Sequence, residues 1–175
     1  MTRGIGPRRA FAALDALAPD PAGGLPEDFF LWISRFVPLV NVDLIIRDGA
    51  GRNLLTWRDD EFYGSGWHVP GGIIRYRERI EERIHATARE EIGCDVAYDP
   101  APLAVEQSVA PERRERSHFI SLVYLCRVAG EPDPARRYCG GTPRRGLWAW
   151  HRGAPPDLLP AQAAYRPYLN AAVNT

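Results

Sequence analysis

Lysine is absent from this sequence, and all 22 of its basic residues are arginine. They are balanced by 22 acidic residues, so the formal net charge at pH 7 is zero. A chain without an excess of either charge is not expected to bind nucleic acid or an anionic membrane through its overall charge. Cysteine is scarce, with only Cys94, Cys126 and Cys139. Their wide spacing excludes a disulfide framework and a zinc ribbon, and we expect a reducing, cytoplasmic location.

Long hydrophobic segments are absent as well. No run approaches the ~18 apolar residues of a membrane-spanning helix, and the opening residues MTRGIGPRRAFAALDALAP lack the apolar core of a secretion signal. The chain has 175 residues, of which 45% are hydrophobic and 25% charged, as is typical of one soluble globular domain. Because residues 1–25 are rich in Arg, Ala, Pro and Gly, we expect a mobile N-terminal extension, followed by a single domain over residues 26–175.

The order of apolar and turn-forming residues predicts strands and helices that alternate. Helices are expected over 8–17, between Pro26 and Pro38, over 77–92 and near 161–165. Strands are expected over 39–47, 53–58, 67–69, 95–108 with interruptions at two prolines, 118–128 and 147–150. Strands that surround a central helix, with further helices at the flanks, indicate an α/β sandwich.

The most informative segment runs from Gly71 to Cys94, GGIIRYRERIEERIHATAREEIGC. A glycine turn leads into a helix that ends in two consecutive carboxylates, Glu90 and Glu91. Both lie on one side of the helix near its C-terminus, where the helix dipole disfavours negative charge. A bound Mg²⁺ would compensate this charge, since it prefers oxygen ligands and substrate phosphates. A lone Glu-Glu pair is usually a solvated helix face, so the prediction depends on the spacing of the whole segment.

That spacing resembles the motif of the Nudix hydrolase superfamily. The positions in register are Gly72, Glu78, Ala88, Glu90, Glu91, Gly93 and Cys94. The motif's Arg-Glu pair is missing, because Ala86 and Thr87 stand in its place. The resemblance implies a Nudix-type α/β/α sandwich with a mixed β-sheet. It also implies a hydrolase that acts on a nucleoside diphosphate linked to another moiety.

Over residues 29–128 the chain resembles the GDP-mannose mannosyl hydrolase branch, in the run FVPLVNVDLIIRDGAGRNLLTWRDD followed by GSGWHVPGG. The resemblance implies Mg²⁺, or Mn²⁺, held by Gly71 and Glu91 with help from Glu90. It places Asp43 at the floor of the site as a substrate-binding residue, and gives Arg58 the stabilisation of the leaving diphosphate, a task that suits a planar, permanently charged guanidinium. For Arg58 the alternative is a surface arginine at the end of a strand.

Two departures from this branch raise further questions. Without the motif arginine, Glu78 needs another partner, and Arg75 and Arg79 are the nearby candidates.

The branch also takes its general base from a histidine in a late loop, but the corresponding stretch here, CGGTPRRGLWAW, has none. His118 is our first candidate for the base because its unperturbed pKa lies near 6.5. An ordinary hydrogen-bonding role at a strand edge is the alternative for His118.

Other residues outside the motif remain open. Glu106 and Glu112 are the alternative bases, and we expect His68 to face the sheet interior or the surface. Arg116, with its neighbours Arg113 and Arg114, is a candidate for closing over the diphosphate; the alternative is a solvated loop with internal Arg–Glu pairing.

The sequence therefore predicts a Mg²⁺-dependent hydrolase of a nucleotide sugar such as GDP-mannose, which releases the sugar and a nucleoside diphosphate. Two alternatives are a pyrophosphatase that attacks phosphorus and a Nudix-fold protein that binds a nucleotide without cleaving it. The resemblance also implies a homodimer, for which the apolar segment FFLWISRF is a plausible contact.

Overall fold

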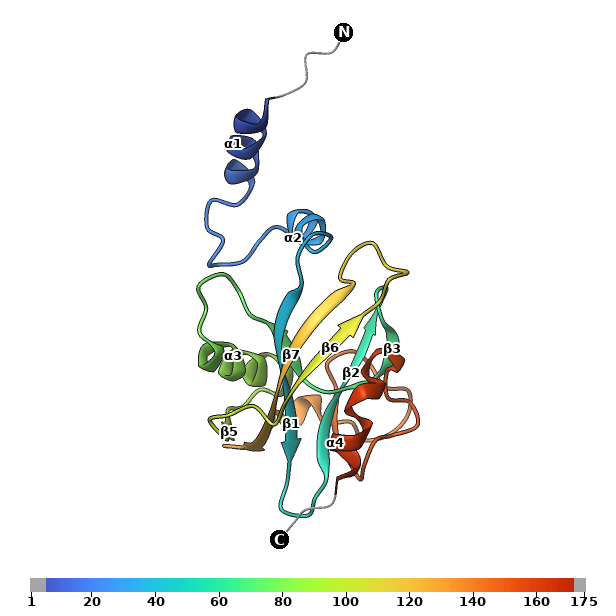
Figure 1. The fold of residues 1–175 in the computed structure, drawn as a ribbon. Coiled ribbons are helices and arrows are strands. Elements are labelled where there is room, and N and C mark those ends of the chain that lie inside the picture. Colours follow the sequence, from blue (N-terminus) through green and yellow to red (C-terminus); the bar gives the residue numbers. More distant parts are fainter. Residues whose placement is uncertain (1–5, 172–175) are drawn as a thin grey trace.

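The computed structural model describes residues 6–171, which form one mixed sheet with helices on both of its faces (Figure 1). The helices are α1 Pro7–Leu17, α2 Glu27–Ile33, α3 Ile80–Ile92 and α4 Arg166–Asn170, with 3-10 turns η1 Pro134–Arg136 and η2 Pro160–Tyr165. The strands are β1 Leu39–Arg47, β2 Asn53–Asp60, β3 Gly64–His68, β4 Gly71–Ile73, β5 Val96–Tyr98, β6 Ala104–Val109, β7 His118–Val128 and β8 Trp148–His151. No described helix is long and apolar enough to cross a membrane.

Strand β1 organises the sheet. One of its edges pairs in parallel with β7 over the whole run from Leu39 to Ile46. The other edge is shared, because its first half pairs with β4 and its last residues pair with β2, both antiparallel. Strands β2 and β4 therefore separate along β1, and this separation leaves room for a site between them.

Each face of the sheet has its own apolar core, because side chains alternate along β1. Val42, Leu44 and Ile46 pack under α3. Ile45 points to the opposite face, where it packs with Val123 and with residues of the C-terminal segment. The mixed sheet between two helical layers confirms the predicted α/β/α sandwich.

Helix α3 is the element that carries the motif. Ile84, Ala88 and Ile92, each one turn apart, lie on its buried face. The helix begins at Ile80, later than the predicted start, because Arg77 has a φ of 62° and a capping box forms between Arg79 and Glu82. It ends at Gly93, whose φ of 75° is the left-handed conformation that favours glycine.

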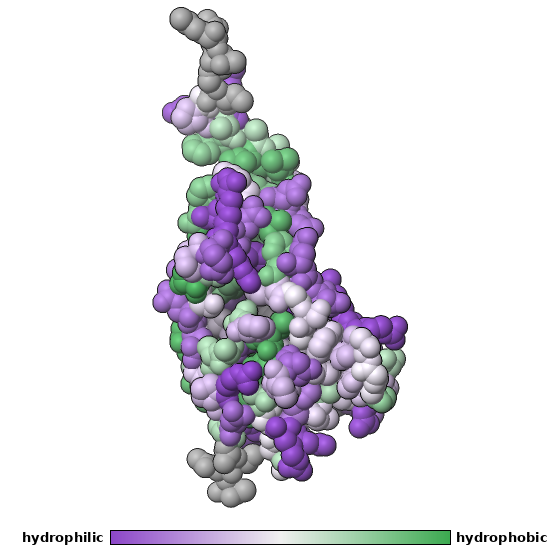
Figure 2. Space-filling model, turned by 90° about the vertical axis from the view of Figure 1, so that its right-hand side faces the viewer, coloured by the Kyte–Doolittle hydropathy of each residue, from purple (hydrophilic) through white to green (hydrophobic). Residues whose placement is uncertain are grey.

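The N-terminal segment lies apart from the sheet (Figure 1). Helix α1 is present as predicted, and none of its residues is buried. The predicted mobility of residues 1–25 stays a prediction, and residues 1–5 lie outside the described residues, as do 172–175 of the predicted domain. Figure 2 shows apolar side chains gathered at this end of the molecule, where Phe11, Leu17, Trp32 and Phe36 are exposed. The predicted homodimer through FFLWISRF stays a prediction as well.

The packing of α3 gives a matched pair of variants. Ile84→Ala removes a fully buried side chain and should lower the free energy of unfolding by about 2–5 kcal/mol. Ile80→Ala, one turn earlier on a side chain that is 38% exposed, should cost less than about 1 kcal/mol. Urea unfolding followed by circular dichroism measures both values. Equal losses for the two variants would contradict the assigned helix face.

Candidate active site

A cavity of about 800 Å³ opens where β2 and β4 separate. Its walls come from the glycine turn, the last turn of α3, strands β1 and β2, and the C-terminal segment. Its lining includes every residue predicted for the metal and the substrate, namely Asp43, Arg58, Gly71, Glu90, Glu91 and Arg116. Segments far apart in the sequence are therefore brought to one site.

Glu91 is held from behind by two buried residues. Thr56 donates its hydroxyl hydrogen to the Glu91 carboxylate over 2.9 Å, and the same hydroxyl lies 2.9 Å from Nε2 of His68. The His68 Nδ1 lies 2.9 Å from the Val69 carbonyl, so this nitrogen carries the hydrogen. Burial lowers the pKa of His68, although the nearby Glu91 carboxylate opposes the shift. The His68 ring thus lies in the wall of the cavity, with Nε2 3.8 Å from a carboxylate oxygen of Glu91.

A buried arginine replaces the missing motif arginine. Arg83 donates to both carboxylate oxygens of Glu78, over 2.7 and 3.0 Å, and also reaches the Glu90 carboxylate at 3.4 Å. The expected partners were Arg75 and Arg79, and that expectation was wrong for their side chains: only the backbone N–H of Arg75 bonds to Glu78. Glu78 precedes the helix, so helical spacing does not reveal its partner.

Gly71 and Asp43 face each other across the β1–β4 pair. A Cβ atom on Gly71 would lie 2.1 Å from an Asp43 carboxylate oxygen, so only glycine fits here. Asp43 accepts hydrogen bonds from Asn41, over 2.8 Å, and from the Tyr165 hydroxyl. Burial raises the pKa of Asp43, although the hydrogen bonds from Tyr165 and Asn41 oppose it.

Three guanidinium groups surround the ring of Tyr63. Arg58, Arg113 and Arg116 lie 4.6, 4.7 and 5.6 Å from its centroid. Arg58 also forms an ion pair with Asp60 in the same strand. The cavity thus has an acidic side at the end of α3 and a basic side at Tyr63, as a metal-bound diphosphate requires.

The family model of the NUDIX domain matches residues 37–166. This range covers most of the chain, including the glycine turn, α3 and the strands around the cavity. The chain belongs to the NUDIX family.

Individual NUDIX-like relatives match over shorter ranges. A low-salt glycan biosynthesis protein, Agl8 of Haloferax volcanii, is 38% identical over 82 residues, 47% of this chain and 52% of that protein. An ADP-ribose pyrophosphatase of Methanocaldococcus jannaschii is 32% identical over 93 residues, 53% of each chain. The chain therefore spans about half the length of these curated relatives.

The fold is also seen in solved structures. The crystal structure of a possible asymmetric diadenosine tetraphosphate hydrolase from Jonesia denitrificans superposes with a TM-score of 0.57. The identity is 18%, and the match covers 79% of this chain and 99% of that one. At this identity the match shows the NUDIX fold alone.

The residues present fit a divalent cation of the Mg²⁺ type. Gly71, with its backbone carbonyl, Glu90 and Glu91 offer hard oxygen donors on one cavity wall. No cluster of three or more His, Cys, Asp or Glu side chains suited to a metal occurs in residues 6–171. Since Mg²⁺ usually binds one or two carboxylates and completes its shell with waters and phosphates, this small donor set suits a cation that is shared with a diphosphate.

Thr87 stands where the NUDIX motif has its glutamate, and it is packed inside the protein. Its side chain is 1% exposed, and its hydroxyl has no partner among the described residues. A Cβ on Gly72 would lie 2.3 Å from this hydroxyl oxygen. The tight packing leaves position 87 without a group that reaches the cavity to act as a base.

The candidate bases from outside the motif are not brought to the acidic wall. His118 lies 2.9 Å from the Gln107 amide on the neighbouring strand, while Phe119 next to it lines the cavity. Glu106 accepts a hydrogen bond from Tyr168, and Glu112 is an exposed residue near Arg113.

His68, expected at the sheet interior or the surface, is buried and lines the cavity beside Glu91. The pairing of Thr56 with His68 across β2 and β3 explains this placement.

The Arg83–Glu78 pair makes stability depend on pH. Partial burial raises the pKa of Glu78, but hydrogen bonds from Arg83 outweigh it and hold the pKa below the ordinary value of 4.5. The pair therefore stabilises the fold fully above pH 4.5, and this contribution is lost as the pH falls through the lower folded-state pKa.

Arg83→Met should lower the free energy of unfolding by about 3 kcal/mol near neutral pH, because it leaves the Glu78 carboxylate without its partner. The difference from the unmodified chain should narrow as the pH falls below about 4.5 and through the lower pKa of Glu78 in the folded unmodified chain, where Glu78 becomes protonated in both proteins. Urea unfolding across this range measures the difference, with Arg79→Met, at an exposed arginine, as the control. A difference that stays constant with pH would contradict the assigned pair.

Proposed function

We propose that this NUDIX protein is a Mg²⁺-dependent hydrolase of a nucleoside diphosphate linked to a sugar, such as GDP-mannose, and that it releases the sugar and the nucleoside diphosphate. The observation that carries the proposal is the shared cavity, whose lining brings Glu90, Glu91 and Gly71 together with Arg58. The name of the Haloferax relative, a glycan biosynthesis protein, supports a sugar-linked substrate.

Each residue has a task in this proposal. Glu91 and Gly71 hold the cation, and Glu90 assists from the adjacent position. When bound, the cation withdraws charge from the diphosphate and makes it a better leaving group. Arg58 stabilises the negative charge that develops on the leaving diphosphate. Asp43, at the cavity floor beside Gly71, binds the substrate, and the elevated pKa of its carboxyl suits a hydrogen bond to a hydroxyl group.

A second candidate is attack at phosphorus, which yields a nucleotide and a sugar phosphate. The Methanocaldococcus relative, an ADP-ribose pyrophosphatase, favours it. A third candidate is binding without cleavage, which the absence of a base at position 87 favours. Chromatography of the products distinguishes the first two, and thermal stabilisation by the nucleotide without turnover would identify the third.

Glu91→Gln tests the metal wall, by which we mean the side of the cavity with Gly71, Glu90 and Glu91, where the cation is proposed to bind. The change keeps the shape of the side chain but removes its charge, so we expect kcat/KM to fall at least about a hundredfold. A panel of nucleotide sugars and ADP-ribose with Mg²⁺ measures it, and Mn²⁺ binding followed by electron paramagnetic resonance reports the site without turnover. Glu81→Gln, on the first turn of the same helix, is the matched control. Unchanged turnover and Mn²⁺ affinity in Glu91→Gln would rule out the metal assignment.

His118→Ala tests the proposed base. If His118 accepts the proton from water, kcat should fall by about 10²–10⁴-fold while KM changes little, and the acidic limb of the pH–rate profile should disappear. If its contact with Gln107 is its only role, kcat will be close to that of the unmodified enzyme. That second result would reject His118 and leave Glu106, Glu112 and His68 to be tested in the same assay.

A further inference from the structure

A second cavity, of about 400 Å³, adjoins the large one, and we call the two the first and second lobes. The two lobes share Tyr63, Arg116 and Phe119 among their lining residues. Arg58 lines only the first lobe and Arg113 only the second. The row of guanidinium groups therefore extends past the diphosphate region into space that a larger ligand would enter.

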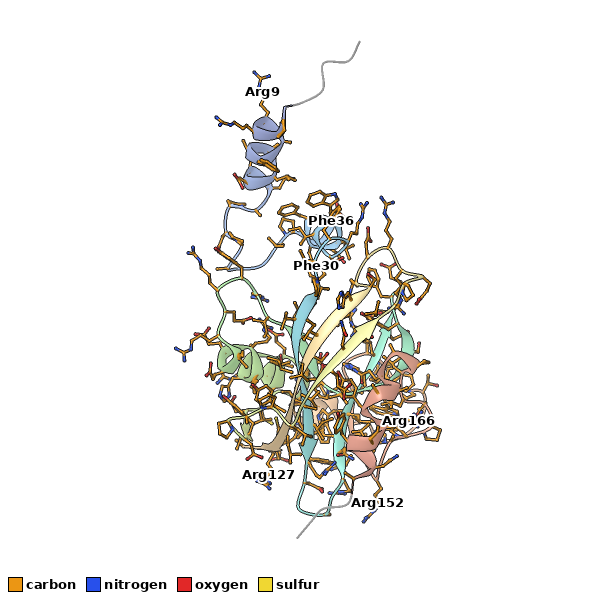
Figure 3. All side chains as sticks on the ribbon, in the orientation of Figure 1. Arg9, Phe30, Phe36, Arg127, Arg152 and Arg166 are labelled. Atoms are coloured by element: carbon orange, nitrogen blue, oxygen red, sulfur yellow. The ribbon has the colours of Figure 1, made fainter. Side chains whose placement is uncertain are left out.

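Arg116 is the connecting residue, and its charge is not neutralised. Its guanidinium is surrounded by aromatic rings, 5.2 Å from the centroid of Phe62 and 5.7 Å from that of Phe30. Phe30 belongs to α2, and Figure 3 shows it on the side of that helix that faces the sheet. The buried Nε of Arg116 has no hydrogen-bond partner among the described residues, and Arg116 forms no ion pair with a described carboxylate. A buried donor without a partner is costly, so this group is suited to a ligand that accepts from it.

The backbone holds Arg116 in this position. Its φ is 50°, a left-handed conformation that is unfavourable for a residue with a side chain. The conformation is fixed by Ser34, a buried residue after α2, whose hydroxyl accepts the Arg116 N–H over 3.0 Å. The loop between β6 and β7 is thereby tied to α2 with the guanidinium directed at Tyr63.

The second arginine of this lobe is only loosely compensated. Arg113 has one acidic neighbour, Glu112, at 3.8 Å, and the Glu112 side chain is 71% exposed. An ion pair of this kind contributes little and is readily exchanged for a ligand. The second lobe therefore holds two positive charges and one weakly bound negative charge.

We propose that the second lobe recognises a negatively charged group on the moiety beyond the diphosphate, so that the substrate is a nucleoside diphosphate linked to an acidic sugar or to a phosphorylated one. The inference rests on the proposed function, because it assumes that the diphosphate lies between Arg58 and the metal wall. A neutral sugar would leave Arg116 without a partner and Arg113 with only the exposed Glu112. A carboxylate or phosphate accepts two hydrogen bonds from a guanidinium fork.

Binding of matched ligand pairs tests this inference. UDP-glucuronate and UDP-glucose differ by one carboxylate, and ADP-ribose 1″-phosphate and ADP-ribose differ by one phosphate. Dissociation constants are measured by calorimetry with Ca²⁺, which also prefers oxygen ligands. Turnover of the same compounds is measured with Mg²⁺. We expect the acidic member of at least one pair to bind about tenfold or more tightly, and the pair that shows this preference identifies the anion.

Arg113→Ala should reduce that preference to near unity, while affinity for the neutral member stays within about twofold. Arg114→Ala, at the exposed neighbouring arginine, removes the same net charge and should keep the preference. Thermal melting checks that both variants are folded.

Equal affinity for both members of both pairs, or a preference that survives Arg113→Ala, would overturn the assignment of the second lobe. Turnover of the neutral compounds would in that case still support the hydrolase. If none of the nucleotides binds or is cleaved, the proposed function and the inference fail together.

Discussion

The cavity depends on one buried cation, Arg83. Its guanidinium holds Glu78 and thereby fixes the connection between β4 and α3, and it also reaches Glu90 at the metal wall. Its aliphatic stem packs so closely under Gly72 that a Cβ there would lie 2.9 Å from its Cδ. One charge thus couples the glycine turn, the helix and the acidic wall. An uncharged residue at position 83 would leave the carboxylates of Glu78 and Glu90 without their shared cation, and their negative charges would repel each other.

The site combines fixed and adaptable parts. Behind Glu91 lie Thr56 and His68, which are almost wholly inaccessible and joined across two paired strands. Such packing holds a carboxylate in one orientation before any cation arrives, which lowers the cost of binding. The basic side is made differently, from arginines around Tyr63 in a strand end and a loop. Loops carry much of the variation in specificity among related folds, so the chemistry and the choice of substrate are assigned to different elements.

Much of this could be predicted from the sequence, for identifiable reasons. Strands β1 and β7 were predicted with their observed bounds, because long apolar runs between turn residues leave few alternatives. The place of Glu90 and Glu91 in the cavity was predictable because their spacing from the glycine turn is fixed along one chain segment. Strand β4 was missed, since two of its three residues are glycine and only pairing with β1 makes it a strand. Arg83 was missed because its partner Glu78 lies before the helix, where helical spacing does not apply. His68 was missed because its partners Thr56 and Glu91 are distant in the sequence.

The far wall of the cavity is built from the C-terminal segment. Gln162 accepts the backbone N–H of Val69 just before the glycine turn, and Tyr165 donates to Asp43 at the cavity floor. These contacts tie the last helical turns to the motif region, although 93 and 122 residues separate the two pairs of partners in sequence. Changes at residues 160–165 would therefore reach both the cavity floor at Asp43 and the strand end that leads into the glycine turn. For enzyme engineering, this short and continuous stretch offers a library site outside helix α3 itself.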